Sequence, residues 1–337
     1  MSISPIANIT RAATRKEGEP LNILCNSIHE AYQTSISKCN ANFYIFQHPH
    51  CKKWNTTYRP LPPNFIQLKE ELKQNQIPPY VDFDLVLIES VFGHFQIMKP
   101  IADAMHVPTL RLEHTSRMPW WDDDKMRELK NLKADTNVFI SAQSRSDWWF
   151  EEDALVIEHG IDTQEFCVGA QERVGGISVA NDFKNRGNIL GFEEWKYIVK
   201  DLPIKLLGAT PGISNPAGSV GELVSHYQSA LAFVNTSIFS PIPMSLLEAA
   251  ACGCAIISTA TCAIPDIFTH ADNAFLSNDP QELRGYFQHC LAHPEVAIEM
   301  GKKARKVIED RFGLERFVGE WNEVFIRAAS VPYLGVT

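Results

Sequence analysis

The residues best suited to chemistry in this chain lie between positions 233 and 260. Residues 235–243 are rich in Ser, Asn and Pro and form a loop, and residues 244–251 are strong helix formers. A loop that enters a helix presents free backbone N–H groups and the positive end of the helix dipole, which together bind phosphate. Glu248, about one turn into this helix, could then hold a ribose, as acidic residues do in nucleotide-binding α/β folds.

Few backbone donors are available in this loop. Pro241 and Pro243 have no backbone N–H, so only Ile242, Met244 and Ser245 can offer backbone hydrogen bonds to a phosphate. A phosphate held here would therefore depend on the amides at the very start of the helix.

Buried strands must position this loop and helix. We predict strands over residues 230–234 and 255–257, with Gly253 ending the helix between them. A further strand over residues 204–207 ends in Gly208, which we place with the residues of the nucleotide site because ligands sit beyond the carboxyl ends of parallel strands.

Residues 248–259 read Glu-Ala-Ala-Ala-Cys-Gly-Cys-Ala-Ile-Ile-Ser-Thr. They resemble the donor-binding motif of retaining glycosyltransferases with the GT-B fold, the family-four type. That motif begins with a further Glu, which contacts the donor sugar and whose place is taken here by Ser240. The family's Gly-Phe-Gly becomes Pro241-Ile242-Pro243. The resemblance therefore implies that Ser240 lies at the donor, and the missing Glu leaves the identity of the donor sugar open.

The resemblance implies an α/β protein with two Rossmann-like domains, whose parallel sheets face an interdomain cleft. The expected domains are residues 1–160 on the acceptor side, residues 161–314 binding the nucleotide sugar, and a C-terminal helix within 315–337 that crosses back to the first domain. The implied enzyme is a glycosyltransferase that moves a sugar from a nucleotide-diphosphate donor, most simply of the UDP type, to an acceptor hydroxyl with retention. It needs no cofactor besides this donor substrate.

Negative charge develops on the departing diphosphate, so cations must face it. The family places an Arg and a Lys near the start of its second domain, and residues 181–187 lie in the matching region. Arg186 is our first choice for the diphosphate, because its planar fork suits phosphate, and Lys184 is the second. A charged surface loop is the alternative interpretation.

His114 follows a predicted buried strand and precedes Thr115. It resembles the His of the family's Thr-x-His-Thr motif, which touches the donor sugar from the first domain. The alternative is a hydrogen-bonded core His. His29, after the first strand, stands where the family has a glycine-rich loop, and it either faces acceptor or diphosphate or caps a helix.

We expect no metal site. The triplet Asp122, Asp123 and Asp124 precedes a Lys- and Glu-rich helical pattern, so it is interpreted as the start of a helix. The eight cysteines have no paired metal spacing, which favours a reducing, cytoplasmic compartment. Residues 1–20 lack the apolar core of a signal peptide, and no apolar run is long enough to span a membrane.

The first half of the chain alternates strands and helices, which implies a parallel sheet. Strands are predicted over 21–25, 42–46, 85–88, 109–112, 138–140 and 154–157, and helices over 31–38 and 95–105. In the second half, the last amphipathic helix is predicted over 315–328.

The acceptor is the open question. The net charge of −9 argues against a protein built mainly to grip nucleic acid and favours a saccharide, lipid-linked or small-molecule acceptor. The Ser-Pro-Ile-Pro loop is similar to short bacteriophage transferases, some of which glycosylate hydroxymethylated DNA bases. Ser240 also leaves open a non-catalytic nucleotide-sugar-binding module. Aromatic and basic residues of the first domain could serve the acceptor or the core: Trp120, Trp121, Trp148, Trp149, Phe150, Lys52, Lys53, Arg59, Arg117, Lys125, Arg127, Lys130 and Lys133.

Overall fold

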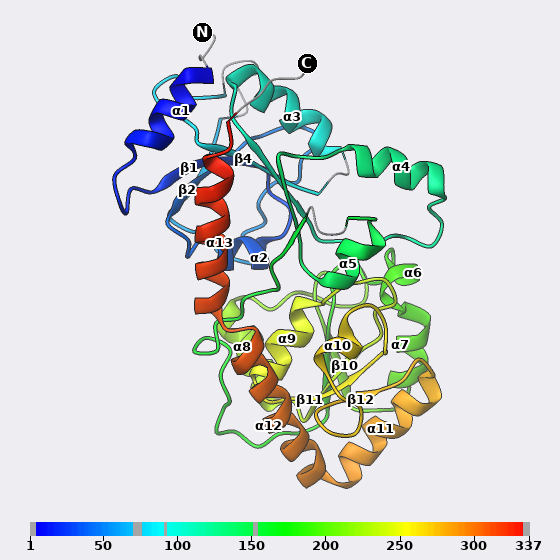
Figure 1. Ribbon diagram of the computed structural model, residues 1–337. Coiled ribbons are helices and arrows are strands. Elements are labelled where there is room, and N and C mark those ends of the chain that lie inside the picture. Colours follow the sequence, from blue (N-terminus) through cyan, green and yellow to red (C-terminus); the bar gives the residue numbers. More distant parts are fainter. Residues whose placement is uncertain (1–4, 70–75, 91–92, 151–153, 333–337) are drawn as a thin grey trace. The chain divides into compact units, whose positions relative to one another are not determined.

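The computed structural model of the protein describes residues 5–69, 76–90, 93–150 and 154–332. The chain divides into two compact units, each built on its own parallel sheet (Figure 1). Unit 1 comprises Met1–Thr56, Pro60–Glu158 and Glu315–Thr337, and unit 2 comprises Thr57–Arg59 and His159–Leu314. The α/β class predicted from the alternation of strands and helices is confirmed.

The sheet of unit 1 has seven strands in the order β3-β2-β1-β4-β5-β6-β7, and all neighbouring strands are parallel. The strands are β1 Leu21–Cys25, β2 Ala41–Ile45, β3 Phe65–Gln67, β4 Leu85–Glu89, β5 Thr109–Glu113, β6 Thr136–Phe139 and β7 Leu155–Val156. β4 and β5 are buried along their whole length, as expected of parallel strands covered on both faces.

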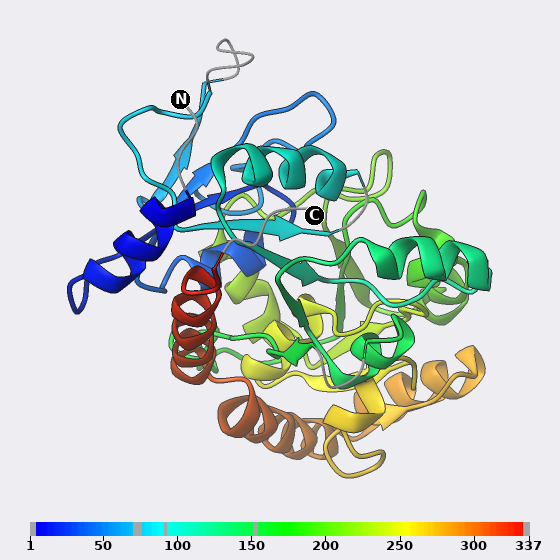
Figure 2. The ribbon, with the colours of Figure 1, turned by 45° about the horizontal axis from the view of Figure 1, so that its top comes forward.

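The helices of unit 1 are α1 Pro5–Thr14, α2 Glu30–Ile36, α3 His94–Met105, α4 Asp123–Asn131, α5 Ala142–Asp147 and α13 Leu314–Ala329. Of these, α3 and α13 cover the two faces of the sheet. α3 packs on the face that carries Leu24 and Val86. On the opposite face Phe325 of α13 meets Phe43, with ring centroids 6.0 Å apart, so α3 and α13 lie on opposite sides of the sheet (Figure 2).

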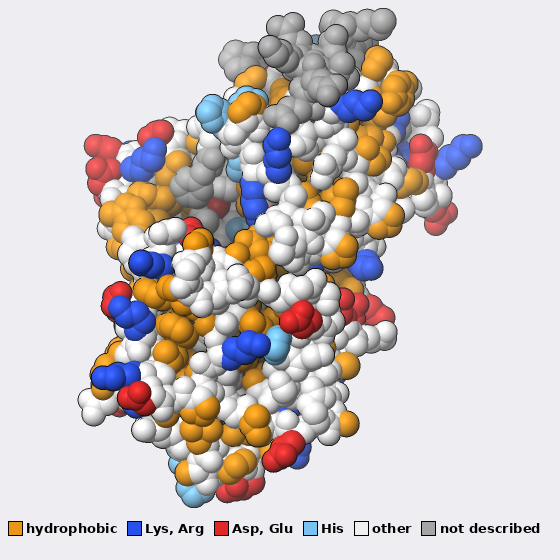
Figure 3. All heavy atoms as spheres, turned by 180° about the vertical axis from the view of Figure 1, so that it is seen from behind, with side chains coloured by type: hydrophobic (Ala, Val, Ile, Leu, Met, Phe, Trp, Pro, Cys, Tyr) orange, Lys and Arg blue, Asp and Glu red, His pale blue; other side chains and the backbone are white. Residues whose placement is uncertain are grey.

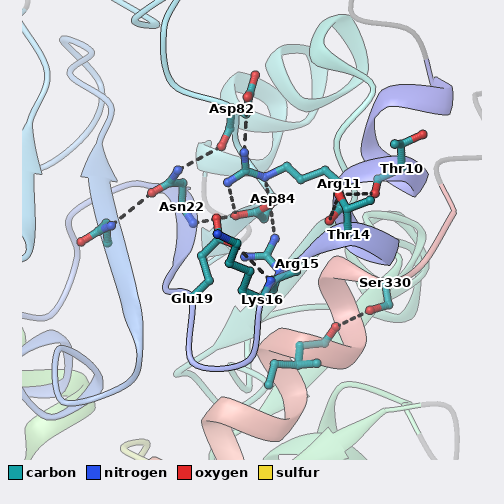
Figure 4. A network of polar contacts seen from close by, with 12 residues as sticks. Thr10, Arg11, Thr14, Arg15, Lys16, Glu19, Asn22, Asp82, Asp84 and Ser330 are labelled. Carbon is teal, nitrogen blue, oxygen red and sulfur yellow. Dashed lines mark hydrogen bonds and ion pairs between the residues drawn. The ribbon is translucent and has the colours of Figure 1, made fainter.

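The N-terminal helix α1 is attached to the sheet by charge. Arg11 and Arg15 both donate to the carboxylate of Asp84, which is buried just before β4 (Figure 4). Asp84 also accepts from the amide of Asn22 at 2.7 Å. A single buried carboxylate thus joins α1, β1 and β4, with its negative charge balanced by two guanidinium groups.

The sheet of unit 2 has five parallel strands in the order β12-β11-β10-β8-β9. They are β8 Gly176–Val179, β9 Ile204–Leu207, β10 Ala232–Asn235, β11 Ala255–Ser258 and β12 Phe275–Leu276. The helices are α6 Gly187–Leu190, α7 Phe192–Val199, α8 Val220–Ser229, α9 Met244–Ala251, α10 Ile264–Ile267, α11 Pro280–Ala292 and α12 Pro294–Arg311.

The predicted order of strand, loop, helix and strand is found as β10, α9 and β11. Gly253 follows α9 with φ +80°, a left-handed conformation that glycine adopts without strain and that turns the chain into β11. Gly301 of α12 packs so closely on this turn that a Cβ atom there would lie 2.1 Å from the carbonyl oxygen of Gly253. The small residues around position 253 therefore allow α12 to approach the backbone of the α9–β11 turn.

Candidate active site

The start of α9 presents free amides in unit 2. Pro243 is extended, with φ −66° and ψ 120°, and α9 begins at Met244. Among the described residues, no backbone carbonyl accepts from the amides of Met244 or Ser245, as expected in a first helical turn. Ser245 Oγ donates to the carbonyl of Val179 at 3.2 Å. The helix therefore begins beside the carboxyl end of β8.

Side-chain hydrogen bonds hold the loop that precedes α9. Asn235 Nδ2 donates to Ser258 Oγ at 2.8 Å, and Ser237 Oγ donates to Asn235 Oδ1 at 2.8 Å. Nε2 of the buried His159 donates to the carbonyl of Ile242 at 3.1 Å, and since a carbonyl only accepts, this nitrogen carries the proton. The loop is thus anchored at both ends.

The basic candidates lie on the loop that follows β8. Lys184 and Arg186 are exposed, and neither side chain donates a hydrogen bond to any residue within the described ranges. Partial desolvation lowers the pKa of Arg186 and the Asp182 carboxylate raises it, but a guanidinium stays protonated throughout. Ser240 is half-buried and lies on the same loop as Ile242. These cations are therefore available to an anionic ligand.

The backbone conformation at position 208 by itself explains why this residue is glycine. Its φ of +114° is a conformation that side chains rarely adopt, and a Cβ atom there would lie 2.0 Å from the carbonyl oxygen of Ala180. The close approach of the loops after β8 and β9 thus requires glycine at this position. A contribution to nucleotide binding stays a prediction.

Glu248, the residue predicted to hold a ribose, has two protein partners. Arg59 donates to its Oε1 at 2.6 Å, and the hydroxyl of Tyr227 donates to its Oε2 at 3.1 Å. All three side chains are buried. Arg59, which the sequence grouped with the basic residues of the first domain, instead belongs to unit 2 and is buried against Glu248, so it is not part of an exposed basic surface.

His114 lies in a polar cluster of unit 1. Its Nε2 is 3.3 Å from Oε2 of Glu89, the buried last residue of β4. Gln33 Nε2 donates to the other oxygen of Glu89 at 2.6 Å. The ring of Tyr32 meets the ring of His114 edge-on, with centroids 4.7 Å apart. Because a carboxylate accepts, Glu89 keeps a proton on Nε2 of His114 and leaves Nδ1 as the acceptor in the neutral ring.

Several other predicted residues have structural roles. His29 Nδ1 accepts from the amide of Tyr32 at 3.3 Å, which is the helix-capping alternative. Asp122 caps α4 by accepting from the amide of Lys125, as predicted. Trp148 is buried and donates to the carbonyl of Thr115 at 2.8 Å.

Most of the other aromatic candidates also pack rather than face solvent. Phe150 is buried in the same apolar cluster as Trp148, and Trp121 and Trp149 pack against it, whereas Trp120 is exposed. Within the described ranges, no group of His, Cys, Asp or Glu side chains is arranged to hold a metal ion. Nor is any helix in the described part of the chain long and apolar enough to cross a membrane.

Sequence reasoning missed Glu89 and Tyr227, and it assigned Arg59 to the basic residues of the first domain rather than to Glu248. Glu89 could have been found, because it is a charge that ends the apolar run of β4, just as His114 follows the end of β5. Arg59 carries no such signal, since it stands beside Pro60 in a proline-rich stretch far from Glu248 in sequence.

Comparisons with known proteins agree with this geometry. Residues 216–307, which include α8, β10, α9 and β11, match the family of glycosyl transferases group 1. No curated protein matches the sequence.

Several solved structures have a similar fold. Sucrose-phosphate synthase from Thermosynechococcus elongatus is 15% identical with a TM-score of 0.69, over 91% of this chain and 98% of that chain. HepE from Anabaena, solved with UDP and glucose, is 14% identical with a TM-score of 0.66, over 90% of this chain and 99% of that chain. TarM from S. aureus, solved with UDP, Fondaparinux and alpha-GlcNAc-glycerol, is 12% identical with a TM-score of 0.54, over 71% of this chain and 55% of that chain.

At these identities the likeness shows the fold, which is GT-B, and the predicted fold is confirmed. The chain therefore has the GT-B fold, and its residues 216–307 match the model of glycosyl transferases group 1. The matched segment contains both the free amides of α9 and Glu248.

Proposed function

We propose that this protein transfers a sugar from a UDP-type nucleotide-diphosphate donor to an acceptor hydroxyl. The observation that carries the proposal is the start of α9, where the unpaired amides of Met244 and Ser245 precede Glu248 within the family segment. The amides, with that of Ile242, bind the diphosphate, and the carboxylate accepts from the ribose. The UDP in the HepE and TarM structures supports uridine as the base.

In the proposed reaction, the diphosphate leaves with negative charge that Arg186, aided by Lys184, stabilises. Ser240 and Gly208 line the donor, and His114 contacts the sugar. The configuration at the transferred carbon is retained, as in the family that the α9 motif resembles. Inversion, detected by NMR of the product, would contradict this part of the proposal.

The proposed reaction does not depend on a metal ion. Arg186 and Lys184 supply positive charge on the loop after β8. Asp122, the first residue of the acidic triplet considered as a metal site, instead caps α4 through its carboxylate. Activity that EDTA abolishes and Mn²⁺ restores would contradict metal independence.

The acceptor in this proposal is a saccharide, a lipid-linked sugar or a small molecule. Several basic side chains of unit 1 that could meet DNA form ion pairs with carboxylates: Lys52, Arg117, Lys125 and Arg127. On the face of unit 2 seen in Figure 3, Lys and Arg are interspersed with Asp and Glu rather than gathered into one stripe. A phosphate backbone is bound by a continuous basic surface, so charge favours a sugar-like acceptor over a hydroxymethylated DNA base.

Release of UDP from UDP-sugars tests the proposed function. A panel of UDP-sugars is incubated with the protein, with and without saccharide acceptors, and free UDP is measured. We expect slow release without acceptor and faster release with a suitable one. UDP-sugar binding without any release, across the panel, would favour the non-catalytic module suggested by Ser240.

We further propose a reducing, cytoplasmic compartment. All eight cysteines are free thiols. Burial raises the pKa of Cys254 to about 11 and that of Cys39 to about 12, so both remain neutral and unreactive at ordinary pH. Disulfides found by mass spectrometry in protein from its native source would contradict this location.

A further inference from the structure

Glu248 is a buried carboxylate whose two hydrogen-bond partners, Arg59 and Tyr227, belong to unit 2. It is 4% exposed, and Arg59 and Tyr227, which donate to its two oxygens, are 8% and 0% exposed. Arg59 comes from the segment Thr57–Arg59, which belongs to unit 2 although its neighbours in sequence belong to unit 1. The guanidinium also lies over the ring of Phe166, 5.9 Å from its centroid.

Burial of Glu248 disfavours the ionised form of its carboxylate. Desolvation raises the pKa of Glu248, and the nearby carboxylate of Glu165 raises it further. Arg59 and the hydroxyl of Tyr227 act in the opposite direction, and Arg59 is the larger of these two influences. The thiol of Cys252 is a further titratable group that interacts with Glu248, and burial raises its pKa well above its usual range. Among the described residues, Arg59 is the cation that donates to Glu248 and favours its ionised form.

The two contacts leave the carboxylate able to accept more hydrogen bonds. An ionised carboxylate has about four lone-pair sites, and Arg59 and Tyr227 occupy one on each oxygen. The two remaining sites match a ligand that carries two neighbouring hydroxyls, as a ribose does. Protonation would turn one oxygen into a donor and destroy this match.

We propose that Arg59 is a positioning residue for donor binding, which holds Glu248 ionised and oriented so that its free lone pairs accept from the ribose hydroxyls. This inference rests on the proposed function, since it assigns a nucleotide ribose to Glu248. In this arrangement Arg59 does not touch the nucleotide, and its effect passes through the carboxylate.

The test is the pH dependence of UDP-glucose binding. Each phosphate of UDP-glucose has one ester and one anhydride bond, so neither titrates near neutral pH, unlike the terminal phosphate of UDP. Calorimetric affinities are measured between about pH 5 and pH 8 for the wild type, Arg59→Gln, Arg59→Lys and Glu248→Gln. Histidines also titrate in this window, and Glu248→Gln reports their contribution alone.

We expect affinity in the wild type to fall when Glu248 becomes protonated at low pH. Arg59→Gln removes the main influence that lowers the pKa of Glu248, so its midpoint moves to higher pH. Below that midpoint its affinity falls about tenfold per pH unit. Arg59→Lys keeps the positive charge but loses the planar guanidinium. We expect the pH midpoint of its binding to lie between those of the wild type and Arg59→Gln. Glu248→Gln binds weakly and lacks this midpoint.

Arg173→Gln is the matched control. Arg173 donates to the carbonyls of Cys252, at the other end of α9, and of Ala230, at 2.9 Å for the latter, without facing Glu248. Its replacement lowers the melting temperature but leaves the binding midpoint in place. Arg59→Lys keeps the test available should Arg59→Gln fail to fold, as judged by circular dichroism.

Three outcomes would overturn the inference. An unchanged midpoint in both Arg59 variants would reduce the pair to a structural contact. Tighter binding by Arg59→Gln at every pH would show that Arg59 competes with the ribose for Glu248. No binding of UDP-glucose by the wild type would overturn the proposed donor and this inference together, whereas the first two outcomes leave the proposed function intact.

Discussion

Buried glutamates organise the polar residues of both units. Glu89 ends β4 and accepts from Gln33 and His114, and Glu248 lies in α9 and accepts from Arg59 and Tyr227. Removing one partner of a buried charge leaves the other without compensation, so these contacts restrict side chains to single orientations. Glu89 thereby orients His114, and Arg59 and Tyr227 orient the carboxylate of Glu248. We propose that His114 and Glu248 contact the donor.

The proposed leaving-group role predicts a large effect of Arg186→Gln on rate. Arg186 is exposed and makes no side-chain hydrogen bond to a described residue, so its loss should leave the melting temperature nearly unchanged. Removing a positive partner of the developing charge should lower kcat about 100-fold or more.

Lys196→Gln is the control for Arg186. Lys196 is a cation on the adjacent helix α7, in a surface pair with Glu193 at 2.6 Å. Its replacement should leave kcat within a factor of about 2, because surface pairs contribute little. Equal kcat values for both variants would remove Arg186 from the proposed reaction.

If His114 contacts the sugar, its replacement should affect sugar transfer without affecting the affinity for UDP. His114→Ala should lower transfer by about tenfold, the effect of losing one hydrogen bond to a neutral hydroxyl, while the affinity for UDP without sugar stays unchanged. Calorimetry with UDP and steady-state kinetics with a UDP-sugar separate the two effects. Weakened UDP binding together with a lowered melting temperature would instead indicate a core His.

The local structure of the candidate site could be predicted where its residues are close in sequence. The helix start that carries the amides of Met244 and Ser245, and the place of Glu248 in that helix, follow from one loop and one run of helix-forming residues. The partners of Glu248 could not be predicted, because Arg59 lies 189 residues away from it and Tyr227 lies 21 residues away. Such long-range contacts form only when the chain folds, and no sequence pattern near Arg59 predicts them.

At the scale of elements, predicted and observed bounds differ by a residue or two. The strand predicted over 42–46 is β2, Ala41–Ile45, and the helix predicted over 315–328 is α13, Leu314–Ala329. The helix α1 was not predicted at all. The contacts of Arg11 and Arg15 with Asp84, about 70 residues further along the chain, join it to the sheet, and no pattern within residues 5–14 predicts them.

The packing of α12 on the α9–β11 turn predicts opposite effects for two helical glycines. Gly301→Ala would place a methyl group 2.1 Å from the carbonyl oxygen of Gly253. Because backbone must shift to relieve this contact, we expect unit 2 to lose about 1–3 kcal/mol of unfolding free energy.

Gly285→Ala is the matched substitution in α11. Nothing lies within 4 Å of a Cβ atom at Gly285, so the higher helix propensity of Ala should stabilise by about 0.5–1 kcal/mol. Urea denaturation of both variants measures the difference. Equal stabilisation by both would show that α12 does not pack tightly on the turn.

At the scale of the whole molecule, charge decides between acceptors. The chain carries a net charge of −9, and many of its basic side chains are paired with carboxylates. We therefore predict that transfer to a saccharide acceptor depends little on salt. Binding to duplex DNA would instead weaken with a logarithmic slope of about −0.9 for each phosphate contacted.

Labelled sugar separates these acceptors directly. UDP-sugar with a radioactive sugar is offered saccharides, hydroxymethylated DNA and unmodified DNA at two salt concentrations. Label on hydroxymethylated DNA but not on unmodified DNA, lost at the higher salt, would contradict the predicted acceptor class while leaving the donor site as proposed.

Calorimetric titration with UDP tests whether the start of α9 and Glu248 bind a nucleoside diphosphate. We predict that the wild type binds UDP more tightly than UMP, because the amides of Met244 and Ser245 face the diphosphate. Glu248→Gln should weaken UDP binding by about 1.5–3 kcal/mol, the contribution of a hydrogen bond to a charged group. Glu299→Gln, an exposed position in α12, should bind like the wild type. No UDP binding, or equal affinity in the wild type and Glu248→Gln, would contradict this role of α9 and Glu248.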